Sequence, residues 1–190
     1  MNTLQRFNVL CRAEVNGNTL HGVASVFDQV ADTSEGPEMF ARSAYDAVLA
    51  DPNQDSVSLF NHNPDYILGR QSAGTLTLRS SAEGLVFDVD LPDTQWGHDV
   101  RVLARRGDLG GASVGFVPGQ SQLESVNGVR VRMHTAVARL RDVSPVTFPA
   151  YSGTNGSLSM RSADQLVRST RGRSQLIRAR ARVTLGRGAK

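Results

Sequence analysis

Alternating apolar and polar residues recur in five separate segments of the chain, and this pattern most restricts what the chain can fold into. Side chains on a strand point alternately to opposite faces, so a period of two predicts a strand with one buried face. The five segments are TLHGVASVF (19–27), DSVSLF (55–60), GTLTLRS (74–80), LVFDVDL (85–91) and VRVRMHTAVARL (129–140). The sequence therefore predicts a mainly β (α+β) domain.

One turn and two helical segments complete this prediction. SAEG (81–84) separates two alternating segments and indicates a hairpin. ARSAYDAVLA (41–50) and TQWGHDVRVLARR (94–106) are typical of short helices, and Asp93-Thr94 is a suitable cap for the second. We therefore expect strands to predominate, with a few helices beside them.

The distribution of charge divides the chain near residue 160. Residues 161–190 carry nine basic side chains and one acidic side chain, a net charge of +8, whereas the preceding 160 residues carry 12 basic and 17 acidic side chains, a net charge of −5. A chain of 190 residues suits one domain. We expect that domain over residues 1–160, followed by a flexible basic C-terminal tail with too little apolar surface to fold alone.

Cysteine content and hydropathy restrict the compartment. Cys11 is the only cysteine, which excludes a disulfide framework and a cluster of thiol metal ligands. The first residues, MNTLQRFNVLCRAEV, lack a basic flank followed by a sustained apolar stretch, and no segment reaches the ~18 apolar residues of a membrane helix. We expect a soluble protein in a reducing compartment, with no cleaved signal and no membrane partner.

One serine lies in a glycine-rich segment, GDLGGASVGF (107–116). Its core, GASVG, fits the G-x-S-x-G pattern of a nucleophile elbow, but glycine and serine are also common in tight turns. An elbow of the α/β-hydrolase type needs an acid and then a histidine later in the chain, which leaves only Glu124 and His134. These lie too close together to hold the strands and helices of that fold. Ser113 is therefore either a small residue in an exposed turn or a nucleophile in another fold.

A serine nucleophile needs a base within hydrogen-bond reach and a third group that orients the base. His62, in SLFNHNPD, follows an apolar strand and precedes a proline turn, a rim position that suits either a functional or a structural side chain. His21 and His134 lie inside alternating segments, which favours structural roles. His98 lies in the first turn of a predicted helix, where we expect it to be solvated.

Asp142 is the candidate for the third group. It lies in ARLRDVSPVTFPAY (138–151), between a predicted strand and an apolar segment that contains two prolines. A carboxylate with apolar neighbours needs hydrogen bonds or a charged partner. An imidazole N–H would satisfy it, and so would a basic neighbour such as Arg139 or Arg141, so the residues alone leave both interpretations open.

Five motifs occur together in the order and approximate spacing typical of one family: SLFNHNPDYILGR, GTLTL, GLVFDVDLPDTQWGHDV, RRGDLGGASVGF and LRDVSPVTFPAY. From about Gly22 to Tyr151 the chain resembles the prohead (capsid maturation) serine proteases of tailed bacteriophages. GVASVFD and EGPEMFARSAYDAVL resemble the N-terminal part of that family. The resemblance implies a fold like that of the herpesvirus assemblins, a small herpesvirus-protease-like β-barrel with a few surrounding helices.

Carried over position by position, the resemblance implies a catalytic triad of Ser113, His62 and Asp142. It implies an acyl-enzyme mechanism and no metal or organic cofactor. Two positions depart from the family pattern: members often have Glu where this chain has Asp142, and Phe where it has Val114. A side chain one methylene shorter moves the carboxylate by about an ångström, which bears on the hydrogen-bond geometry at this position.

The resemblance also implies where the enzyme works and what it cleaves. We expect a serine endopeptidase that processes scaffold and major capsid protein segments, and itself, inside the assembling prohead in the host cytoplasm, with self-association as a further expectation. The hydrogen-bond donors to the oxyanion of the reaction would be backbone N–H groups at the glycines beside Ser113, or the side chain of Arg105 or Arg106. The alternative is a catalytically inactive assembly or scaffolding protein with the same barrel. The basic tail alone would suggest nucleic-acid binding, which the acidic body with few aromatic residues disfavours.

Overall fold

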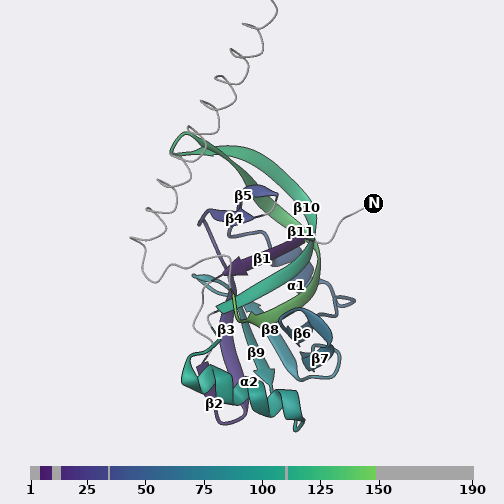
Figure 1. Cartoon of the computed structure of the whole chain (residues 1–190). Helices are drawn as coiled ribbons and strands as arrows, with labels where there is room; N and C mark the ends of the chain where they lie inside the picture. Colours follow the sequence, from purple (N-terminus) through teal and green to yellow (C-terminus); the bar gives the residue numbers. More distant parts are fainter. Residues whose placement is uncertain (1–4, 10–13, 34, 110, 149–190) are drawn as a thin grey trace, which may run out of the picture.

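The computed structural model describes residues 5–9, 14–33, 35–109 and 111–148 (Figure 1). The predicted basic tail and its boundary at residue 160 lie outside the described residues. In chain order the described elements are β1 (Gln5–Val9), β2 (Glu14–Asn16), β3 (Thr19–Val26), β4 (Ala31–Thr33), β5 (Gly36–Phe40), α1 (Asp46–Ala50), β6 (Val57–Phe60), β7 (Asn63–Arg70), β8 (Leu76–Ser80), β9 (Gly84–Asp90), α2 (Gln95–Arg106), β10 (Gly111–Val126) and β11 (Val129–Val146).

The strands form two sheets around one hydrophobic core. The larger sheet has the order β1-β10-β11-β5-β4, and β6 pairs with both β11 and β7; the smaller has the order β2-β3-β9-β8. Buried side chains from both sheets form the core, among them Leu20 and Phe87 from the smaller sheet and Phe116 and Leu140 from the larger. The prediction of a mainly β domain is confirmed. The pairings described leave both sheets open, and the closed barrel stays a prediction.

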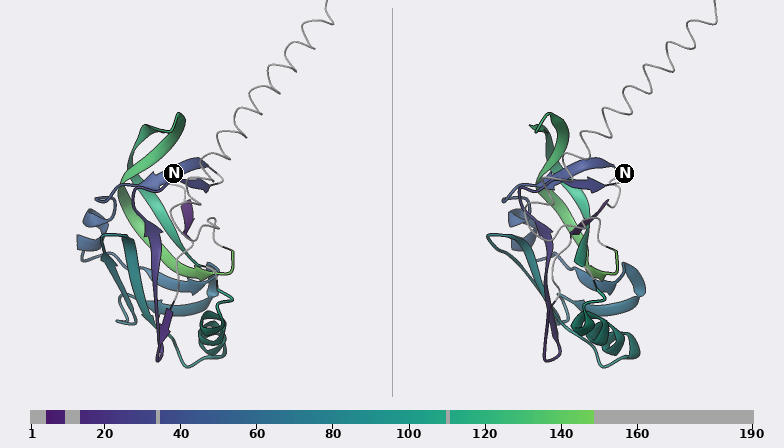
Figure 2. Two further views of the ribbon diagram at one scale, coloured as in Figure 1. Left: turned by 90° about the vertical axis from the view of Figure 1, so that its left-hand side faces the viewer. Right: turned by 60° about the vertical axis from the view of Figure 1, so that its left-hand side comes forward.

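β10 and β11 form a long antiparallel ribbon that curves along one side of the molecule (Figures 1 and 2). Its pairing begins at Gly111 with Val146 and runs to the turn at Asn127 and Gly128. Register shifts between Gly115 and Ser121 bend the ribbon, because an extra residue on one strand increases the local twist. The ribbon is the centre of the larger sheet, because β1 pairs with β10 and both β5 and β6 pair with β11.

The alternating segments are strands, as predicted, but the glycine-rich segment is not a turn. β3, β6, β8, β9 and β11 lie within or across the five predicted segments, and β8 pairs with β9 as the predicted hairpin. The expectation of an exposed turn at Ser113 is wrong, because Ser113 lies in β10 and is fully buried. β10 pairs with a strand on each side here, and small or β-branched residues suit a strand buried on both faces.

Of the two predicted helices, one is confirmed and one is shorter than predicted. α2 begins after Thr94, whose Oγ1 accepts a hydrogen bond from the Gly97 N–H at 3.2 Å. α1 covers only the second half of 41–50, because backbone groups earlier in that segment bond to β11: the Ala41 N–H donates to a β11 carbonyl, and the Ala44 carbonyl accepts from a β11 N–H. Within the described part of the chain, no helix is long and apolar enough to cross a membrane.

Candidate active site

His62 lies in a two-residue turn between β6 and β7. Phe60 pairs with Asn63, and the two residues between them, Asn61 and His62, have φ angles of 53° and 57°. Two successive residues with positive φ are typical of the type I′ turn that joins tightly paired strands. Asn and His enter this region more readily than most residues, so the sequence of the turn suits its shape.

Asn61 ties this turn to the end of β11. Its backbone N–H donates to the Pro145 carbonyl at 3.0 Å, and its side-chain amide exchanges hydrogen bonds with Thr147. In these, the Thr147 N–H donates to Asn61 Oδ1 at 2.9 Å, and Asn61 Nδ2 donates to Thr147 Oγ1 at 3.2 Å. These contacts fix the position of His62 relative to β11.

Ser113 lies near the open end of the ribbon, where it pairs with Ser144 of β11 and with Asn8 of β1. Its Oγ is 2.7 Å from Nε2 of His62. The His62 side chain is 10% exposed to solvent, whereas Ser113 is fully buried. The sheet therefore presents the serine hydroxyl to the Nε2 edge of the imidazole ring, and the serine itself lies in a buried strand rather than on a loop.

Asp142 approaches the same imidazole from the other side. It lies in the central strand β11, between Gly115 of β10 and Val57 of β6, and is 5% exposed. Its Oδ1 is 2.5 Å from His62 Nδ1, and the same oxygen accepts a hydrogen bond from Ser144 Oγ at 2.6 Å. Of the two interpretations that the sequence left open, the structure shows the imidazole as the partner of the carboxylate.

Gly115 provides the space that the carboxylate of Asp142 occupies. A Cβ atom added to Gly115 would lie 2.1 Å from Asp142 Oδ2 and 3.0 Å from its Cγ, well inside van der Waals contact. The glycine at this position therefore allows the close approach of a side chain from the neighbouring strand. Sequence reasoning considered the glycines near Ser113 only as neighbours of an oxyanion and missed this role.

The two arginines considered as oxyanion donors have other partners. Arg105 Nη2 donates to the Gly17 carbonyl at 2.9 Å, and Arg106 Nε pairs with Asp108 at 2.8 Å. Both contacts lie on or next to the end of α2. In this structure these guanidinium groups are therefore directed to other parts of the molecule.

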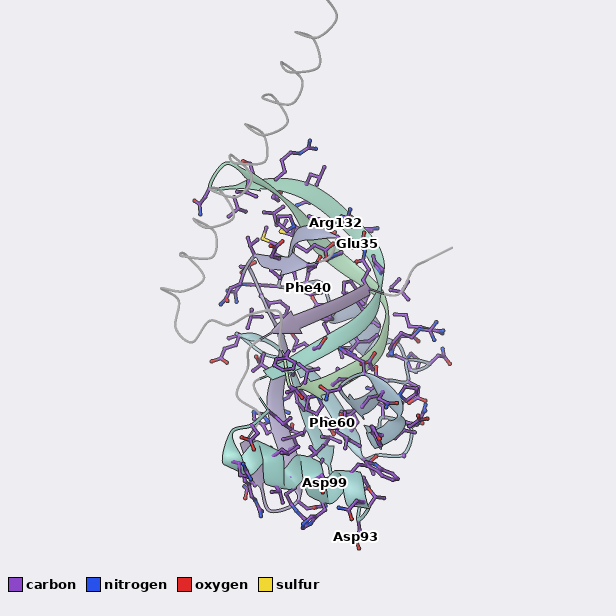
Figure 3. All side chains as sticks on the ribbon, in the orientation of Figure 1. Glu35, Phe40, Phe60, Asp93, Asp99 and Arg132 are labelled. Carbon is purple, nitrogen blue, oxygen red and sulfur yellow. The ribbon has the colours of Figure 1, made fainter. Side chains whose placement is uncertain are left out.

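The other three histidines lie elsewhere in the fold. His21 is in β3, and His98 is on the exposed side of α2. His134 is buried in β11, two residues after Arg132, which Figure 3 labels far from Phe60, the residue that precedes the β6–β7 turn. Among the described residues, no group of three or more His, Cys, Asp or Glu side chains could hold a metal ion.

A comparison of the sequence with models of protein families identifies the family of this chain. The model of the family described as caudovirus prohead serine protease matches residues 7–169. The chain belongs to this family. The match includes Ser113, His62 and Asp142, and it makes the protein a serine peptidase of phage capsid maturation. No curated protein and no solved structure matches the chain significantly.

In this prohead protease, the close contact between Gly115 and Asp142 can be tested by substitution. Gly115→Ala is expected to lower the free energy of unfolding by about 1–3 kcal/mol, because its methyl group would overlap the Asp142 carboxylate. Urea unfolding measures this change. In an Asp142→Ala background the same substitution is expected to cost much less, and an equal cost in both backgrounds would show that the overlap lies elsewhere.

Proposed function

We propose that this chain is an endopeptidase with a catalytic triad in which Ser113 is the nucleophile, His62 the general base and Asp142 the group that orients the base. One observation carries the proposal: the His62 imidazole spans the gap between the other two side chains, with Nε2 at 2.7 Å from Ser113 Oγ and Nδ1 at 2.5 Å from Asp142 Oδ1. A nucleophile, a base and an orienting acid within hydrogen-bond reach are what acyl transfer by serine requires.

The reaction follows from which nitrogen of His62 carries the proton. The Asp142 carboxylate can only accept, so Nδ1 carries a hydrogen that it donates to Oδ1, and Nε2 is left free to accept. As Ser113 Oγ attacks the peptide carbonyl carbon, its proton passes to Nε2. His62 then gives this proton to the leaving amine. In the second half, His62 takes a proton from the water that attacks the acyl carbon and returns it to Ser113 Oγ as the ester bond breaks and the acid product leaves. Asp142 stabilises the imidazolium that forms between the two transfers.

For substrates, we propose scaffold and major capsid protein segments and the chain itself, cleaved inside the assembling prohead. Family membership and the proposed triad support this assignment.

We also propose that the two sheets correspond to an assemblin-like barrel and that residues 1–160 form the protease domain. The basic segment 161–190, with a net charge of +8, would dock on acidic surfaces of scaffold or coat protein during assembly.

Self-processing tests whether the chain is a protease or an inactive assembly protein. When the purified full chain is incubated, we expect its intact mass to fall with time through loss of a C-terminal fragment, because chain termini are preferred sites of proteolytic cleavage. Mass spectrometry follows the change. Ser113→Ala is expected to keep its full mass, and a wild-type chain whose mass also never changes would favour the inactive scaffolding protein.

Docking by the tail is tested by deletion. Removal of residues 161–190 is expected to lower the number of protease copies in isolated proheads several-fold, since the segment carries a net charge of +8 whereas the rest of the chain is net negative. Incorporation is measured by quantitative immunoblotting of purified particles. Reactivity of Ser113 should persist in the truncated chain, and unchanged incorporation would contradict docking through this segment.

A further inference from the structure

Ser144 is a buried polar residue that the proposed reaction does not use. It follows Asp142 by two positions in β11, so both side chains point to the same face of the sheet. It is fully buried, and its Oγ donates to Asp142 Oδ1 at 2.6 Å. Ser144 also pairs across the strands with Ser113, which places it beside the nucleophile.

The oxygen that Ser144 contacts is the one that contacts the histidine. Asp142 Oδ1 is 2.6 Å from Ser144 Oγ and 2.5 Å from His62 Nδ1, and Oδ2 lies over Gly115. A carboxylate held only by His62 could rotate about its last torsion and exchange its two oxygens, because this torsion is broad. The second donor and the close packing at Gly115 together leave one orientation.

We infer that Ser144 is a positioning residue of the triad, an inference that rests on the proposed function. Its hydroxyl fixes the orientation of the Asp142 carboxylate and the distance between this carboxylate and His62. In this position the carboxylate holds the proton of His62 on Nδ1. It also satisfies a lone pair of a nearly buried carboxylate, since a buried charge with an unmet hydrogen bond is unfavourable. Ser144 therefore acts through Asp142 and His62.

A fluorophosphonate probe tests this without knowledge of the natural substrate. In wild type, Ser113 Oγ is expected to form a bond to phosphorus, fluoride leaves, and the hydroxyl proton passes to His62; mass spectrometry of the full chain follows the adduct. For Ser144→Ala we expect the maximal rate of adduct formation to fall roughly 10- to 100-fold, the effect of a lost hydrogen bond to a charged group. The probe concentration that gives half of this rate should stay unchanged.

Three other variants separate positioning from packing. Ser144→Thr keeps the hydroxyl and should retain most of the rate, whereas Ser144→Cys keeps the unbranched shape but offers only a weak S–H donor and should react almost as slowly as Ser144→Ala. Ser58→Ala is the matched control, because Ser58 is another buried serine beside β11 whose Oγ has no hydrogen-bond partner among the described residues. Its rate should equal that of wild type.

A second measurement needs no reactivity at all. In a Ser113→Ala background, the proton NMR resonance of His62 Nδ1–H is expected to shift, or to broaden by exchange with water, when Ser144 is also replaced by alanine. An unchanged resonance, or a Ser144→Ala labelling rate equal to that of wild type, would overturn the inference. A wild-type chain that never forms the Ser113 adduct would instead overturn the proposed function.

Discussion

Replacing Ser113 by alanine is expected to lower peptide cleavage by on the order of 10⁶-fold, the loss seen when a serine nucleophile is removed from a complete triad. Alanine differs from serine by one oxygen and fits a buried position in a strand, so the fold should persist. Initial rates on a scaffold or coat substrate measure the loss, and far-UV circular dichroism verifies the fold.

The same experiment includes its own test of the triad as a unit. His62→Ala is expected to be about as inactive as Ser113→Ala, and the double variant no worse than either, because members of a triad act together and their losses do not add. Losses that multiply in the double variant, or a variant of either residue that cleaves at the wild-type rate, would contradict the assignment.

The second large effect is expected at Asp142. Asp142→Asn keeps the volume but is expected to lower turnover by about 10⁴-fold, because an amide favours the wrong tautomer of His62 and does not stabilise the imidazolium. Rates at saturating substrate measure this loss. Asp142→Glu is the matched comparison: it keeps the carboxylate, and we expect it to retain clearly more activity than the amide. A fully active Asn variant would assign Asp142 a purely structural ion pair.

Alternation of apolar residues predicted those strands that have one buried face. Leu76 and Leu78 face Val89 and Phe87 across the β8–β9 hairpin, the pairing that their spacing predicted. The same rule failed at β10, because a strand paired on both sides and buried on both faces loses the alternation, and its glycines resemble those of a turn. β7 was also missed, since its first residues, including Pro64, are typical of a turn and are tolerated only at a sheet edge.

The site residues were predictable in kind but not in arrangement. Local patterns identified Ser113, His62 and Asp142 as candidates, but only the family resemblance placed them together. Their contacts span 51 and 80 positions of the chain, and no local pattern encodes such distances. The position of the acid within its strand was also wrong: Asp142 was expected after a strand, whereas β11 continues to Val146.

That misplacement explains why Ser144 was not recognised. Two residues that are i and i+2 in a loop need not be neighbours, but in a strand they share a face. Once Asp142 and Ser144 are placed in β11, the sequence DVS predicts the hydrogen bond that the structure shows. Gly115 needs one step more, because its role depends on the register between β10 and β11.

The turn that carries His62 is a shorter segment than the ribbon that carries the other two side chains of the site. Ser113 and Asp142 lie on adjoining strands of a long ribbon, whereas His62 depends on a two-residue turn tied to that ribbon through Asn61. A small segment of this kind can open at a fraction of the free energy that unfolds the whole domain. Because the Asn61 amide hydrogen is bonded to the Pro145 carbonyl, its exchange with deuterium reports how often the turn that carries His62 opens. The exchange rate of one amide thus measures the stability of the segment that holds His62 beside Ser113 and Asp142.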